Sequence, residues 1–268
     1  MASPAGPATV VVPAPPDARP GGLRVLAALA VAGLWVVAVH FGVPGRWGGW
    51  ALNAVLVVLC AAAFTAAGLA AKGPWRRPVR LVGAGEGRLR VPAGPGFSWY
   101  LTGQILFLTA LVGPGQDDDL LRAPDVSAGP VRYALTALLL ALAALVIGGL
   151  VAAVFDGRPR IDLTPAGIEI RGVLGRRNVP WAAVAPGTPQ RSWSGNTLVL
   201  TVVRPELVER RGTAWSPASA PWLDLRWLPI HPWFLSDVLR WYVDHPQERV
   251  AVGTPAGNER LCRALGVA

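Results

Sequence analysis

Five arginines surround a short predicted hairpin and are the residues of this chain best suited to bind an anion. A guanidinium stays protonated and offers five N–H donors in a planar fork, so a patch of arginines can bind the headgroups of anionic lipid. Near a bilayer, each such cation adds about 1 kcal/mol of attraction to anionic lipid. Alternatively, the first two are stop-transfer charges behind a membrane helix and the others solvate the hairpin. These candidate anionic-lipid contacts are Arg158, Arg160, Arg171, Arg176 and Arg177.

Four tryptophans later in the chain are candidate contacts with a protein partner. Surface tryptophan contributes strongly to binding at interfaces, although tryptophan also fills cores, as we expect of Trp181 and Trp241. The four candidates are Trp193, Trp215, Trp222 and Trp227.

The remaining polar residues form no recognisable catalytic, cofactor-binding or metal-binding pattern. Asp117 to Asp119 are contiguous rather than spaced like a calcium loop, so a solvated loop is the simpler interpretation. His231 and His245 lack a nearby cysteine or a close histidine pair, and we expect them at helix ends. The glycine-rich run 83–87 is not followed by Lys-Ser/Thr and is expected to be a flexible loop. The sequence therefore predicts a protein that is not an enzyme and has no cofactor.

The composition is that of a membrane protein. Hydrophobic residues make up 52% and charged residues 15% of the 268 positions, and the mean hydropathy is +0.41. Segments of about 20 apolar residues can cross a hydrocarbon core of about 30 Å. After a disordered cytoplasmic tail at 1–22, the region 23–155 holds four predicted spans, at about 25–43, 50–71, 97–113 and 133–155.

Loop charges orient these spans. The loop 72–96 carries six cations against Glu86 alone, which is typical of the cytoplasmic side. The following loop is acidic and is expected outside, so both termini are cytoplasmic in the plasma membrane. If 97–113 lay only at the interface, the domain after Phe155 would instead face outward. The net charge of +9 then reflects this orientation rather than binding to nucleic acid.

The hydrophobic period changes to two after the fourth span. Ile161 and Leu163 alternate with polar residues, a turn follows at 165–167, and Ile168 and Ile170 continue the alternation. Further strands are predicted around 179–181, 196–203 and 222–228, with long loops at 187–195 and 204–221. Helices are predicted from Pro232 and around 258–265. We expect 156–268 to form a small antiparallel sheet or barrel.

Two stretches carry a resemblance to a known family. RPRIDLTPAGIEIRGVLGRRNVPWAAV and HPWFLSDVLRWYVDHPQER resemble the bacterial pleckstrin-homology-like (PH-like) domains of membrane proteins of unknown role, over roughly residues 158–251. Lysine is scarce and Ala, Gly and Pro are abundant, which fits the codon bias of a high-GC genome, and the resemblance is to the high-GC Gram-positive type of this family. The resemblance implies a bent antiparallel β-barrel with a C-terminal helix at one end, acting as a non-catalytic module.

We therefore expect an integral membrane protein whose cytoplasmic PH-like domain is an interaction or scaffolding module. Its partners would be the lipid bilayer and other membrane or cytoplasmic proteins. One alternative is a regulatory or accessory subunit of a membrane enzyme or transporter, which requires Asn53, Gln104 and the acidic loop to converge on one cavity. Another alternative is an anionic-lipid-sensing module.

Overall fold

The chain forms two compact units, one helical and one built on a β-sheet. The helical unit combines 19–70 with 95–155, and the sheet unit combines 71–94 with 156–268 and the residues that precede 19. The computed structural model describes residues 11–12, 19–40, 46–71, 81–83, 87–91, 93–111, 138, 145, 147–173, 175–192, 194–212 and 216–266. Predictions that lie outside these residues concern Trp193, Trp215, the acidic loop, all four cations at 72–80 and much of the segment 133–155.

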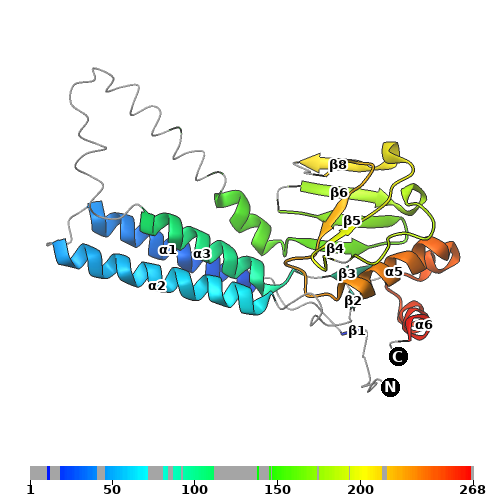
Figure 1. Ribbon diagram of the computed structural model, residues 1–268, viewed down its shortest axis with the longest axis horizontal. Coiled ribbons are helices and arrows are strands. Elements are labelled where there is room, and N and C mark those ends of the chain that lie inside the picture. Colours follow the sequence, from blue (N-terminus) through cyan, green and yellow to red (C-terminus); the bar gives the residue numbers. More distant parts are fainter. Residues whose placement is uncertain are drawn as a thin grey trace. The chain divides into compact units, whose positions relative to one another are not determined.

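Among its described residues, the helical unit contains three long apolar helices (Figure 1). Helices α1 (Arg19–His40), α2 (Arg46–Ala70) and α3 (Pro95–Leu111) overlap the predicted segments 25–43, 50–71 and 97–113, and residues 147–155 are helical as well. Helix α3 packs against both α1 and α2, around a core that includes Trp35, Leu56 and Leu106. Within the described residues, one window, Asn53–Ala70 in α2, is long and apolar enough to cross a membrane.

The second unit is built on a mainly antiparallel sheet of seven strands and a separate pair (Figure 1). The seven strands follow the order β1-β2-β3-β4-β5-β6-β8, and β7 pairs with β9. The alternation predicted from Ile161 to Ile170 is confirmed, because β4 and β5 pair with Ile161 opposite Ile170. The strands are β1 (Val11–Val12), β2 (Leu81–Gly83), β3 (Leu89–Val91), β4 (Arg160–Leu163), β5 (Gly167–Arg171), β6 (Gly175–Pro180), β7 (Thr197–Val199), β8 (Glu209–Gly212) and β9 (Trp222–Asp224).

Strands β2 and β3 come from the segment between helices α2 and α3, and the sequence analysis missed them. β3 pairs with β4, with Leu89 opposite Leu163 and Val91 opposite Ile161. Each strand is three residues long, too short for alternation to show, and the basic residues nearby obscured the apolar ones. The glycine-rich run predicted as a flexible loop lies in part within this hairpin, since Gly83 ends β2 and Gly87 adopts a φ of 71° in the turn.

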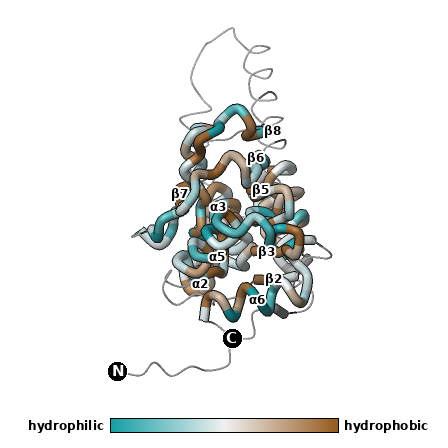
Figure 2. Tube along the Cα trace, turned by 90° about the vertical axis from the view of Figure 1, so that its right-hand side faces the viewer, coloured by the Kyte–Doolittle hydropathy of each residue, from teal (hydrophilic) through white to brown (hydrophobic). Residues whose placement is uncertain are grey.

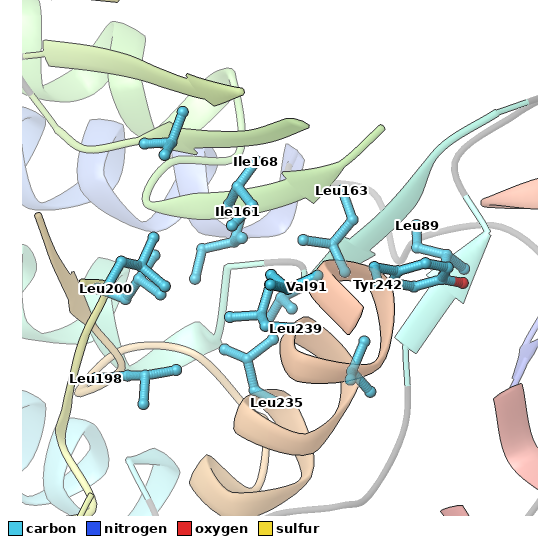
Figure 3. Packing of buried hydrophobic residues seen from close by; sticks show 14 of the residues in the cluster. Leu89, Val91, Ile161, Leu163, Ile168, Leu198, Leu200, Leu235, Leu239 and Tyr242 are labelled. Carbon is cyan, nitrogen blue, oxygen red and sulfur yellow. The ribbon is translucent and has the colours of Figure 1, made fainter. Parts of the chain in front are cut away.

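One hydrophobic core lies between the sheet, the β7–β9 pair and helix α5 (Pro232–Asp244) (Figure 3). Leu89 and Val91 from the hairpin, Leu198 from β7, and Leu235 and Tyr242 from α5 are all buried there. Helix α6 (Pro255–Leu265) adds Leu261. The predicted helix from Pro232 is confirmed, and the terminal helix begins three residues earlier than predicted.

Other boundaries differ from the predictions. The predicted loop 204–221 contains a short 3-10 helix, Pro205–Leu207, and strand β8, whose sequence ERRG has no apolar residue to reveal it. All four β8 residues are exposed, and its charged residues stand out as hydrophilic in Figure 2. Strand β9 ends at Asp224, four residues before its predicted end. Val11 and Val12, from the predicted disordered tail, pair in parallel with β2.

Candidate functional site

A groove of about 350 Å³ opens where β4 and β5 meet the start of β6. The β5–β6 turn forms part of its wall, closed by a hydrogen bond of 2.8 Å from the Gly172 amide to the Gly175 carbonyl. Both apolar residues and arginines line the groove. The lining residues are Pro159, Arg160, Ile161, Ile170, Arg171, Gly172, Gly175, Arg176, Arg177, Ser216, Trp222, Asp224 and Leu228.

The β-sheet register separates the arginines onto two faces. Arg160 lies opposite Arg171, and Arg171 lies opposite Arg176, so these three share the outer face. Arg177 lies opposite Ile170, on the face that points to the hydrophobic core. The groove therefore collects cations from both faces at the end of the strands.

Carboxylates neutralise the outer-face arginines. Asp162 is 0% exposed, and its oxygens lie 2.6 Å from Nε of Arg90, 3.3 Å from Nε of Arg160 and 3.9 Å from Nε of Arg171. Glu169 pairs with Arg171 and Arg176, at 3.2 Å each. A buried carboxylate is tolerated only when it is paired and hydrogen-bonded, so these arginines hold Asp162 in place.

Asp156 joins the same network at the start of the domain. Its carboxylate accepts a hydrogen bond of 2.8 Å from Nε of Arg158 and lies 3.6 Å from Arg160. Partial burial raises the pKa of Asp156, but the Arg158 hydrogen bond and the positive charges of Arg160, Arg158 and Arg171 outweigh burial, so the net pKa lies below its ordinary value. The first two arginines after the helix that ends at residue 155 are thus ion-paired within the domain.

Arg177 is different, because it is buried without a carboxylate partner among the described residues. Only 5% of it is exposed, and it donates two hydrogen bonds of 2.6 Å to Ser216, one to Oγ and one to the backbone carbonyl. Its Nε is buried and makes no hydrogen bond. Burial, and secondarily the charge of Arg210, lowers the pKa of Arg177. Arg210 lies directly opposite it on β8.

The structure gathers most of the predicted site residues. Arg160, Arg171, Arg176 and Arg177 line one groove together with Trp222, whereas Arg158 pairs with Asp156 outside the lining set. Trp222 is 53% exposed, in keeping with a contact residue. Trp227 is partly buried and is not among the lining residues, and the predicted core position of Trp181 is confirmed by its 3% exposure.

Sequence reasoning missed Arg90, Asp162, Arg210 and Ser216 as parts of this site. Asp162 occupies a polar position in the alternating β4 pattern, which suggested a solvated side chain, and Arg90 reaches it only because β3 joins the sheet. Arg210 belongs to a strand without an apolar pattern. No sequence signal connects Ser216 to Arg177, 39 positions earlier.

The groove offers no evident ligand set for a metal. Among the residues that the structure describes, no group of three His, Cys, Asp or Glu side chains is placed to hold a metal ion. His231 and His245 flank α5 as predicted, and the His245 ring stacks on Trp241 with centroids 3.7 Å apart. The arrangement can bind an anion and an apolar group side by side.

The sheet, the β7–β9 pair and helix α5 enclose one hydrophobic core. Within this unit, residues 158–229 match the family model described as Bacterial PH domain. The match begins beside β4 and ends shortly after β9, so it includes neither the β2–β3 hairpin nor helix α5. Neither the comparison with curated proteins nor that with solved structures gave a match.

Proposed function

We propose that this chain is an integral membrane protein whose bacterial PH domain is a non-catalytic interaction module, with the groove beside Trp222 as its contact site. The observation that carries this proposal is the meeting of Arg160, Arg171, Arg176, Arg177 and an exposed tryptophan around one groove. Arginine and tryptophan are the residues that most often dominate binding at interfaces. A guanidinium that stays protonated makes a poor general base, which favours binding over catalysis.

We further propose that the chain spans the plasma membrane four times, with both termini in the cytoplasm. The pairing of β3 with β4 supports this topology. The two strands belong to one sheet, so the chain leaves after Val91 and returns at Arg160 on the same side of the membrane. It therefore crosses an even number of times in between, which is satisfied if 97–113 and 133–155 both cross. This argues against the arrangement in which only 97–113 fails to cross.

The same reasoning extends to the first two helices. Val11 and Val12 pair with β2, so the chain between them and Leu81 also crosses an even number of times. Helices α1 and α2 would then both span. The basic residues of the loop 72–96 support a cytoplasmic location for the shared side, by the positive-inside rule.

The alternative of an anionic-lipid sensor retains one supporting observation. The side chain of Arg176 is 44% exposed at the groove and could reach a headgroup, although Glu169 pairs with it at 3.2 Å. The alternative of a transporter or enzyme subunit gains no such support. Gln104 donates to the Tyr100 hydroxyl on its own helix at 3.0 Å, and the acidic loop lies outside the described residues.

Site-specific photocrosslinking in living cells tests the interaction module. A photoreactive amino acid replaces Trp222 in the full chain, and a second variant carries it at Val250, which is 80% exposed in the same domain. We expect the same discrete protein adducts in independent preparations from position 222, absent from position 250 and diminished by Arg176→Glu. Adducts that are equal at both positions, or none at 222, would contradict the proposal.

A further inference from the structure

Arg177 and Arg210 face each other across neighbouring strands, and no described carboxylate pairs with either of them. β6 and β8 pair with these residues in direct register, so both side chains lie on the same face. Like charges in this arrangement destabilise a sheet, and no ion pair of either residue occurs in the part of the chain that the structure describes. A position that breaks a local stability rule is often a functional one.

The other cations of the groove are already satisfied. Arg160 and Arg171 pair with Asp162, and Arg176 pairs with Glu169. A headgroup with several phosphates would need several cations that lack a carboxylate partner, whereas among the described arginines that line the groove only Arg177 lacks one, and Arg210 lies directly opposite it. Asp224 also stands in the wall and would repel a highly charged ligand. The charge balance therefore suits a ligand with a single carboxylate.

Strand β8 offers an edge next to this pair of arginines. It is the last strand of the seven-stranded sheet, and its four residues are exposed (Figure 1). An extended peptide added to such an edge pairs through its backbone and places alternate side chains on one face. A residue of the peptide opposite Arg210 would thus lie on the face of Arg210 and Arg177, with strands about 4.8 Å apart.

We propose that a partner protein docks an acidic segment as a strand on β8, with a carboxylate side chain opposite Arg210 that also draws on the buried charge of Arg177. The inference rests on the proposed function, for which it names the chemistry of the partner. Charge complementarity specifies the occupant, because the edge bears Arg210 and Arg211 against Glu209 and the arginine pair has no counter-ion among the described residues. The anion also relieves the repulsion between the two guanidinium groups.

Peptide binding to the full chain in neutral phosphatidylcholine nanodiscs tests the proposal. The probe is a nine-residue peptide of alternating valine and threonine with one central glutamate and an uncharged dye, and its control has glutamine instead. By fluorescence anisotropy we expect the glutamate peptide to bind at least about fivefold more tightly, as for one charge-assisted pair. Arg210→Gln should abolish this preference.

Arg211→Gln is the matched control, because it changes the same charge on the same exposed strand but points to the opposite face. It should retain the preference. Equal affinities for the two peptides, or equal loss in both variants, would overturn the proposal. Displacement of the peptide by phosphatidylglycerol nanodiscs in the parent chain but not in Arg210→Gln would instead assign the site to lipid. If crosslinking at Trp222 succeeds while the peptides do not differ, this inference fails and the interaction module stands.

Discussion

Residues 156–268 separated from the β2–β3 hairpin should not fold. This segment contains the whole family match, yet its sheet would begin at β4 with one edge stripped. The expected product is a monomeric chain without a cooperative thermal transition, or an aggregate formed through the exposed β4 edge.

The magnitude follows from what the hairpin buries. Leu81, Leu89 and Val91 are each at most 1% exposed, and full burial of such a side chain is worth about 1.5–3 kcal/mol, so the three contribute roughly 5–9 kcal/mol. Removing Arg90 also takes from Asp162 its closest ion-pair partner, at 2.6 Å. The loss is similar to the whole stability of a typical domain, about 5–15 kcal/mol.

The assay compares three soluble proteins by circular dichroism and by amide-proton NMR dispersion. The first is 156–268 alone, and the second joins 78–94 to its N-terminus through a glycine-serine linker. The third has the same linker and hairpin with Leu89→Ala and Val91→Ala. We expect dispersed spectra and a cooperative transition in the second only. A cooperative transition in 156–268 alone, with the same midpoint as the second, would refute the reasoning.

Three further predictions concern single positions, each measured as the free energy of unfolding of the hairpin-linked domain. Asp162→Asn should cost about 3–5 kcal/mol, because it removes a buried carboxylate shared by three partly buried arginines and leaves Arg90 with no ion pair among the described residues. Asp224→Asn, at an exposed position, should cost under about 0.5 kcal/mol, and equal effects would contradict the buried network. Gly253→Ala should destabilise the domain more than Gly187→Ala. Both glycines have positive φ, but a Cβ at 253 would lie 2.3 Å from the hairpin backbone, whereas a Cβ at 187 would meet nothing within 4 Å. Similar losses of stability in the two variants would argue against the docking of the hairpin. Tyr242→Phe should be neutral or stabilising, because the buried hydroxyl lacks a hydrogen bond. Burial raises the pKa of Tyr242 above its ordinary value, so the stability of the parent protein should fall as the pH rises beyond about 10. The stability of Tyr242→Phe should fall less over the same pH range. A clear loss of stability on substitution at neutral pH would mean that the hydroxyl makes a hydrogen bond.

The sequence predicted the parts of the fold that have a long apolar run, a repeated alternation or an apolar stripe. The apolar runs of α1 to α3, the alternation through Ile161 and Ile170, and the stripe of α5 each extend over enough residues to be read locally. Strands β2, β3 and β8 are three or four residues long and are specified by their neighbours in the sheet. Propensity alone does not reveal such strands.

The site was predicted in its residue types but not in its charge balance. Arginines near the hairpin were evident, and four of them do line the groove. Which of them are neutralised depends on Asp162 and Glu169. Across strands, Asp162 meets Arg90 and Arg171, and Glu169 meets Arg176. The buried state of Arg177 depends on Ser216, far away in the chain. Pairing across a sheet is a property of register, which the local sequence does not state.

The shared membrane side of the hairpin and the domain is tested most directly by thiol labelling in cells. In a variant with Cys60 and Cys262 replaced by alanine, single cysteines are introduced at Arg88, beside β3, and at Val250. A membrane-impermeant maleimide should label both only after the membrane is permeabilised, while a cysteine at Asp118 should react in intact cells. Labelling of positions 88 and 250 from opposite sides of the membrane would contradict the sheet that the β2–β3 hairpin shares with residues 156–268, and with it the topology that follows from this sheet.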